Sequence, residues 1–141
     1  MAETPLNSED QRIRFEEFDL QVESGGRCSA KVVLTWNDDD EFVGTADGLD
    51  SQTGQLRCAA NATSRALEKA FGEGLSLSVL GVKAIKAFDA VLVVVSLTSH
   101  SGGQDQRLVG SCMIDGALAR GAALAVLSAT NRLLANAISS R

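Results

Sequence analysis

The chain alternates between two hydrophobic periodicities, and it runs through the same alternation twice. Six segments place apolar residues at every second position, or in a short continuous apolar run, which is typical of β-strands. Two longer segments place them three and four residues apart, which is typical of amphipathic helices. The predicted strands are residues 12–22, 30–36, 41–47, 75–88, 90–97 and 106–114, and the predicted helices are residues 55–71 and 117–138. The order strand, strand, strand, helix is therefore predicted twice.

Two strands are predicted to be irregular. The alternation in the first strand slips by one residue at Glu16 and Glu17, which indicates a β-bulge, and Gly81 is expected to bend the fourth strand. The fifth strand is apolar almost throughout, so we expect cover on both of its faces. Glycine and polar residues predict a loop over residues 48–54 and a hairpin tip over residues 98–104.

The two halves also share residues, which predicts an internal duplication. The matched segments are residues 43–45 with 109–111, and residues 59–66 with 122–129. We therefore expect one α+β domain over residues 12–141, built from βββα repeats at 12–74 and 75–141, with antiparallel sheet covered by the two helices. Residues 1–11 are polar and contain the only proline, so a flexible N-terminal tail is expected there. The pattern leaves open whether the repeats form one sheet or two.

The second predicted helix is apolar over more than one face. One apolar stripe is enough to cover a sheet, so the additional apolar surface needs cover of its own. We expect a second copy of the chain to provide it in a homodimer, with Leu127, Leu133 and Leu134 at the interface. The alternative is that the first helix of the same chain provides that cover.

Charge and composition exclude several classes of partner. Eighteen acidic and thirteen basic residues give a net charge of -5, and no cluster of Lys or Arg is present, so we expect no binding to nucleic acid or to an anionic membrane surface. The longest apolar run is too short to span a membrane. The polar, acidic start resembles neither a secretory signal nor a transit peptide. Three widely spaced cysteines indicate reduced thiols, and together these features predict a cytoplasmic protein.

The chain offers little material for catalysis. It has one histidine and no tyrosine, and His100 lies in a serine- and glycine-rich segment without a second metal ligand at a suitable spacing. The acidic run at residues 38–41 lacks the oxygen spacing of an EF-hand, so we expect a solvated hairpin tip. Cys58 and Cys112 lie on predicted buried faces and are expected to be core residues. We therefore expect no enzyme activity, no metal and no cofactor.

The starts of the two predicted helices are the candidate ligand sites. Free backbone amides and the helix dipole favour a carboxylate there, glycines allow close approach, and a nearby aspartate could bind an ammonium group. The candidate residues are Gly48, Asp50, Ser51, Gly54, Asp115 and Gly116. The alternative is that the polar residues among them only cap the helices.

Several of these features occur together in a known arrangement. The chain has a Gly44-x-x-x-Gly48 segment, an alanine-rich helix, a strand containing Val82-Lys83-Ala84, an apolar strand, a Val109-Gly110-Ser111-x-x-x-Asp115 segment, and a last helix containing Ala129-Thr130-Asn131-Arg132. Over residues 30–134 this resembles the C-terminal allosteric (dimerisation) domain of 2-isopropylmalate synthase and citramalate synthase. The resemblance implies a duplicated βββα unit that binds a feedback amino acid where two subunits meet, here without the catalytic barrel of the synthases.

The sequence thus favours a non-enzymatic, dimeric regulatory domain that binds a small molecule, an amino acid or another carboxylate. The alternative is a protein-interaction or assembly module that has the same fold and binds a protein partner rather than a small ligand. These two hypotheses predict different responses to metabolites, because only the first predicts that a carboxylated metabolite stabilises the folded chain.

Overall fold

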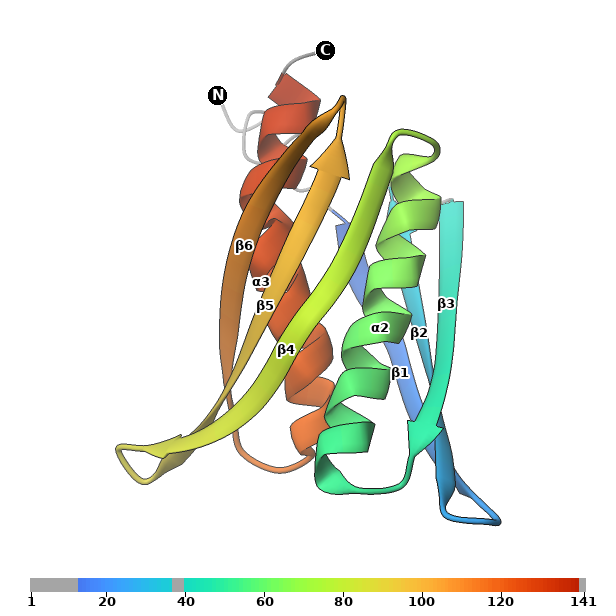
Figure 1. Ribbon diagram of the computed structural model, residues 1–141, viewed down its shortest axis with the longest axis vertical. Helices are drawn as coiled ribbons and strands as arrows, with labels where there is room; N and C mark the ends of the chain where they lie inside the picture. The colour runs from blue at the N-terminus through green and yellow to red at the C-terminus, as the bar shows by residue number, and fades with distance from the viewer. Residues whose placement is uncertain (1–12, 37–39, 140–141) are drawn as a thin grey trace, which may run out of the picture.

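Figure 1 shows the chain as a computed structural model, which describes residues 13–36 and 40–139, with side chains up to residue 131. The tail predicted at residues 1–11 and the first half of the acidic run at 38–41 lie outside this range, whereas Asp40 and Glu41 belong to a strand rather than to a hairpin tip. The elements, in chain order, are β1 (Ile13–Glu23), β2 (Arg27–Trp36), β3 (Asp40–Leu49), α2 (Gln52–Phe71), β4 (Leu75–Ala87), β5 (Ala90–Ser101), β6 (Gln104–Ile114) and α3 (Leu118–Ser139). The predicted order of two βββα repeats is confirmed.

The strands form two separate antiparallel sheets, which answers the question that the sequence left open. Sheet A has the order β1-β2-β3, and sheet B has the order β4-β5-β6. The two helices lie between the sheets and run in the same direction, so the molecule has three layers (Figure 1). The α+β fold class is therefore confirmed.

One hydrophobic core joins the three layers. It contains Val32 and Leu34 from sheet A, Val95 and Leu97 from sheet B, and alanines and larger apolar residues from both helices. Helix α3 packs on β5 and β6 and also on α2. In the part of α3 whose side chains are described, the same chain therefore provides the cover that its apolar faces require.

Both predicted irregularities are confirmed by the strand registers. The pairing of β1 with β2 shifts between Phe15 and Glu17, and the pairing of β4 with β5 shifts between Val79 and Gly81. Each shift inserts one residue into the edge strand of its sheet, so the alternation of inward and outward side chains resumes in the opposite phase beyond it. This is why the hydrophobic pattern of β1 slips by one residue.

The two predicted loops are wrong in extent. In the segment 48–54, β3 continues to Leu49 and α2 begins at Gln52, because its polar residues form a helix cap and first turn rather than a loop. In the segment 98–104, β5 continues to Ser101 and β6 begins at Gln104. Only Gly102 and Gly103, with φ of +60° and +79°, form the turn. The outward-facing positions of this hairpin are polar, so its ends did not look like strand.

The shared glycines of the two repeats allow each helix to lie against its third strand. A Cβ atom built on Gly44 would lie 1.9 Å from the backbone oxygen of Ala62, and one built on Gly110 would lie 2.2 Å from that of Ala125. No side chain fits in either space, so both positions require glycine for close packing of helix on strand. These two contacts also align the repeats residue by residue.

A second pair of aligned positions is filled in opposite ways in the two repeats. In the first repeat, Gly48 of β3 faces Cys58 of α2, and a Cβ on Gly48 would lie 2.9 Å from the Cys58 sulfur. In the second repeat, Ile114 of β6 faces Gly121 of α3, and a Cβ on Gly121 would lie 3.2 Å from the Ile114 Cβ. In the first repeat the small residue is therefore on the strand and the helix residue fills the space between them. In the second repeat the small residue is on the helix and the strand residue fills the space.

Candidate functional site

The two helix starts, which are the ligand sites predicted from the sequence, lie at the same end of the molecule (Figure 1). At the start of α2, Ser51 is the N-cap, and its Oγ accepts a hydrogen bond from the backbone N–H of Gly54 at 3.0 Å. Asp50 Oδ1 accepts a hydrogen bond from Gln55 Nε2 at 2.6 Å. These polar side chains therefore stabilise the helix start, as the capping alternative predicts.

The glycines at this helix start have packing roles of their own. A Cβ on Gly54 would lie 2.0 Å from the backbone oxygen of Leu49, and Gly48 lies against Cys58. At the start of α3, Asp115 is exposed, and Gly116 is exposed with a φ of +128°, a value that favours glycine. The exposed Asp115 carboxylate remains open to solvent, whereas the Asp50 carboxylate already has a hydrogen-bond partner.

The structure describes one of the three leucines that the sequence places at a dimer interface. Leu127 is half-buried and packs against the hydrophobic core between the sheets. The side chains of Leu133 and Leu134 lie outside the described part of α3. Part of the Leu127 side chain therefore belongs to the interior of the same chain, and its place at a dimer interface stays a prediction.

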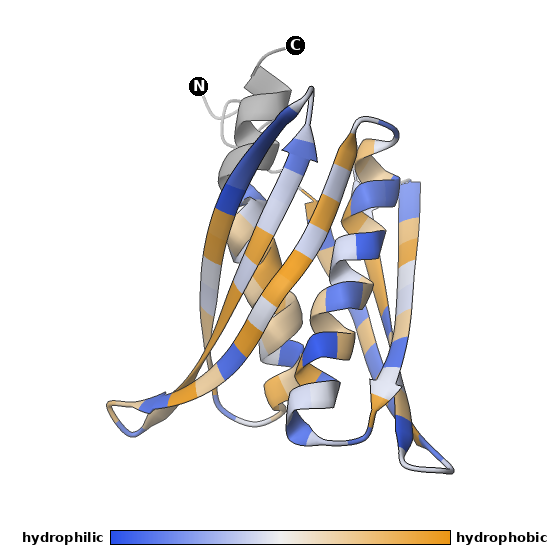
Figure 2. Cartoon of the chain, in the orientation of Figure 1, coloured by the Kyte–Doolittle hydropathy of each residue, from blue (hydrophilic) through white to orange (hydrophobic). Residues whose placement is uncertain are grey.

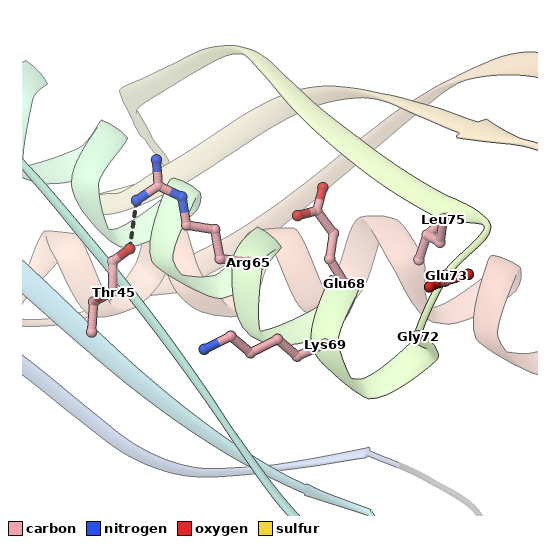
Figure 3. A pocket seen from close by; sticks show the side chains of 7 residues that line it. All are labelled: Thr45, Arg65, Glu68, Lys69, Gly72, Glu73 and Leu75. Atoms are coloured by element: carbon pink, nitrogen blue, oxygen red, sulfur yellow. Dashed lines mark hydrogen bonds between the residues drawn. The ribbon is translucent and has the colours of Figure 1, made fainter.

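A groove of about 520 Å³ lies at the C-terminal end of α2, a place that the sequence analysis did not single out (Figure 3). Arg65 Nη1 donates a hydrogen bond to the backbone oxygen of Thr45, and Lys69 Nζ donates one to that of Val43, both at 2.6 Å. Both acceptors belong to β3, the edge strand of sheet A. The groove is lined by Thr45, Arg65, Glu68, Lys69, Gly72, Glu73 and Leu75. Arg65 and Lys69 thus form hydrogen bonds with backbone carbonyls of β3 that another strand could otherwise pair with.

The second repeat does not repeat the contact that Arg65 makes. Aligning the helices by their glycine contacts places Ser128 of α3 where α2 has Arg65. A serine side chain is too short to reach an edge strand as arginine does. The outer edge of β6 therefore lacks the cationic side chain that covers the edge of β3 at this position.

His100 and Asp105 form a hydrogen-bonded pair at the β5–β6 hairpin, with 2.6 Å between Nδ1 and Oδ1. Sequence spacing did not suggest this pair, because it depends on the two-residue turn that places the two residues opposite each other. Both side chains are largely exposed. The geometry is that of a cross-strand surface pair, and no nucleophile is hydrogen-bonded to it within the described residues.

Cys28 and Cys58 form a buried pair of thiols between β2 and α2. Their sulfurs lie 3.7 Å apart, and the Cys28 sulfur also donates a hydrogen bond to the backbone oxygen of Leu49 at 3.3 Å. Burial, with the adjacent Cys28 sulfur as the next cause, raises the pKa of the Cys58 thiol to about 11. Cys58 is therefore a neutral thiol at physiological pH, and its prediction as a core residue is confirmed. Cys112, the other cysteine expected in the core, is only half-buried.

The outer face of sheet A, which points away from the helices, is strongly charged. The ion pairs on it include Arg27 with Asp47 at 3.2 Å and Lys31 with Glu17 at 3.9 Å. All of its charged side chains are exposed. By strand register they are Arg14, Glu17, Asp19, Glu23, Arg27, Lys31, Glu41 and Asp47. Five acids against three bases make this face acidic.

The outer face of sheet B is different. The strands of this sheet contain many apolar residues (Figure 2), and the register places several of them next to one another on the outer face. The register places Ile85 opposite Leu92, and Leu92 opposite Met113. Val109 lies on the same face of β6; its residue is 64% exposed, and Met113 is 61% exposed. The charged residues that the register assigns to this face are Lys83, Asp105 and Arg107. The solvent-exposed face of an antiparallel sheet usually carries polar side chains. The apolar side chains on this face therefore make it a candidate interaction site.

Comparison with protein-family models and with curated proteins finds no match to this chain. Its relation to a known family therefore stays a proposal. The helices within residues 13–36 and 40–139 include none that is long and apolar enough to cross a membrane. In the same part of the chain, no three His, Cys, Asp or Glu side chains gather as a metal site would require.

Proposed function

We propose that this chain is a non-catalytic module that works by association, as a homodimer joined through the outer face of sheet B. The observation that supports this most directly is the row of exposed apolar side chains across that face, which includes Val109 and Met113. Such a module would be a relative of the allosteric domain that the sequence resembles. Its free thiols fit a reducing compartment, so we place it in the cytoplasm.

Charge favours a second copy of the chain as the occupant of this face. The chain has a net charge of -5, so two copies repel each other wherever acidic surfaces meet. The outer face of sheet A carries five acidic residues, whereas the face of sheet B carries one, Asp105, at its far end beside His100. Two sheet B faces can therefore approach without acidic groups opposing each other at their centres.

The size of the face also suits a dimer. Strands of 13, 12 and 11 residues form it. At about 3.4 Å per residue and about 4.8 Å between strands, the face measures roughly 40 Å by 14 Å in projection. The resulting area of about 560 Å² is of the same order as the roughly 800 Å² that each partner buries in a standard interface. Stacking of two such faces is a common way for sheets to pack.

Replacing Val109 by glutamate tests this interface. In the dimer the two copies of this side chain become buried, so a charge there should separate the protomers. We expect analytical ultracentrifugation to show a dimer for the unchanged protein at micromolar concentration and a folded monomer for V109E. V22E is the matched control, because Val22 is also 64% exposed but lies on sheet A. It should remain dimeric.

Two results would contradict the proposal. One is a monomeric unchanged protein, and the other is a V109E variant that dimerises as well as V22E. A monomer that binds another protein through the same apolar face would instead support the protein-interaction alternative, and V109E would then weaken that binding.

Regulation by a small carboxylate is the second candidate function. It is favoured by the parallel helices, whose N-termini lie at one end of the molecule (Figure 1). The positive ends of two helix dipoles therefore add at that end, which favours an anion. The exposed Asp115 at the start of α3 could bind the ammonium group of an amino acid. In this second reading, the ligand would alter the association of the two protomers.

A further inference from the structure

The buried thiols Cys28 and Cys58 are close enough to react with each other. Their sulfurs are 3.7 Å apart, and a disulfide needs about 2.05 Å, so only a small movement of either side chain is required. The two residues belong to different elements, β2 and α2, and are 30 positions apart in the chain. A bond between them would therefore join a strand of sheet A to the helix that covers it.

The fold itself does not require thiols at this place. In the second repeat, the positions aligned with Cys28, Cys58 and Gly48 hold Val91, Gly121 and Ile114. There, the Ile114 side chain fills the space beside Gly121. Apolar groups thus pack the equivalent site without sulfur. The thiol pair is a feature of the first repeat alone, added to a packing arrangement that works without it.

We propose that Cys28 and Cys58 are an oxidation site, at which hydrogen peroxide closes an intramolecular disulfide. One sulfur first attacks a peroxide oxygen; the O–O bond breaks, a sulfenic acid forms, and the other oxygen leaves as water. The second sulfur then attacks the sulfenic sulfur; the S–S bond forms, the S–O bond breaks, and hydroxide leaves with the thiol proton as a second water. Two thiols and one peroxide give one disulfide and two waters, and two electrons pass from sulfur to oxygen.

The environment of the pair makes this reaction slow rather than forbidden. Both side chains are almost completely buried, and Cys58 is protonated at neutral pH because burial raises its pKa. Each cysteine nevertheless lies near the N-terminal end of its element. Cys28 is the second residue of β2, and Cys58 is in the second turn of α2. Element ends open more readily than their centres, which gives a small oxidant access.

The experiment is a thiol count on the reduced full-length protein before and after incubation with hydrogen peroxide. We expect the number of thiols titrated under denaturing conditions to fall from three to one. Peptide mapping without reductant should show Cys28 linked to Cys58. The bond should raise the melting temperature by several degrees, because it constrains the unfolded chain, and a reductant should reverse the change.

Three variants sharpen the test. C112A removes the cysteine outside the pair and should form the same disulfide, so its count should fall from two to zero. C28V, which copies the valine of the second repeat, and C58A should each form no intramolecular disulfide while remaining folded by circular dichroism. The proposal is overturned if all three thiols persist, if the sulfurs become sulfinic or sulfonic acids without a bond between them, or if the disulfide involves Cys112.

Discussion

At the scale of single residues, the Cys58 thiol shows how burial changes chemistry. It lies 2% exposed against Gly48 and the Cys28 sulfur, in surroundings that disfavour a thiolate. Its raised pKa means that the folded protein holds the thiol proton more tightly than the unfolded chain does. Folding stability must therefore depend on pH wherever the two states differ in protonation.

The expected result is a loss of stability at alkaline pH. Below about pH 9 both states hold the proton, and between about pH 9 and pH 11 only the folded state does, so stability falls with rising pH. A rise of the pKa from 9.0 to about 11 corresponds to a loss of roughly 3 kcal/mol across this window. Urea denaturation at a series of pH values measures it. C58A is the control, and its stability should fall less over the same range; an equal fall would show that other groups cause the effect.

The sequence could predict part of this residue's environment. The helical spacing of apolar residues correctly placed Cys58 on a buried face. It could not place Cys28 beside it, because residues 27–29 are polar or small and the strand was expected only from residue 30. Pairing across 30 residues depends on the sheet that forms around it, and no local pattern encodes that contact.

At the scale of elements, the contact of helix on strand depends on two glycines. Gly110 lies directly under α3, and any side chain there would meet the backbone of the helix at Ala125 and Ala129. Helix backbone cannot give way as a flexible side chain can. The whole helix would have to move off the sheet, which would open the packed core beneath it.

We expect G110A to lower the free energy of unfolding by about 2–3 kcal/mol. Chemical denaturation measures this directly. G81A is the matched control, because Gly81 also lies in a strand but a Cβ there would meet nothing within 4 Å. Its stability should stay the same or rise slightly, since alanine reduces the freedom of the unfolded chain. A G110A variant as stable as G81A would show that the helix does not rest on the strand as described.

The elements were largely predictable, but their ends were not. Six strands, two helices and the bulge of β1 follow from periodicity, which is a local property of the chain, and Gly81 indicated a bend where the register of β4 shifts. The ends near Gly48 and Gly102 were missed because polar residues on a solvent-exposed strand look the same as a loop. The His100–Asp105 pair was missed for the same reason, since it exists only if the strands continue to a two-residue turn.

At the scale of the whole molecule, the parallel helices bring the two candidate helix starts to one end (Figure 1). No local pattern in the sequence indicates this arrangement, because the relative direction of two distant helices depends on how the sheets stack. The sequence did single out the residues themselves, which the structure places at the expected helix N-termini. Asp50 at the start of α2 already accepts a hydrogen bond from Gln55, whereas Asp115 at the start of α3 is exposed. Asp115 is therefore the better candidate of the two aspartates for binding a ligand.

A thermal-shift screen tests the ligand hypothesis. A panel of amino acids and oxo-acids is added to the folded protein, and binding to the folded state alone should raise its melting temperature. At about 100 times its dissociation constant, a ligand adds about 2.7 kcal/mol, which corresponds to several degrees. D115N should abolish the shift caused by an amino acid, whereas D105N, which changes an exposed aspartate of β6, should not. If no compound in the panel shifts the melting temperature, the ligand hypothesis is rejected.

The small residue of one helix–strand contact is on the strand in the first repeat (Gly48) and on the helix in the second (Gly121). This difference determines which amino-acid substitutions each repeat can accept. Gly48→Ile alone would drive a branched side chain onto the Cys58 sulfur, whereas together with Cys58→Gly it would recreate the arrangement of Ile114 and Gly121. Substitutions at the two positions are therefore interdependent, and their effects will not add. A survey of single substitutions would therefore score Gly48→Ile as destabilising, although the second repeat already has the corresponding pair, Ile114 and Gly121.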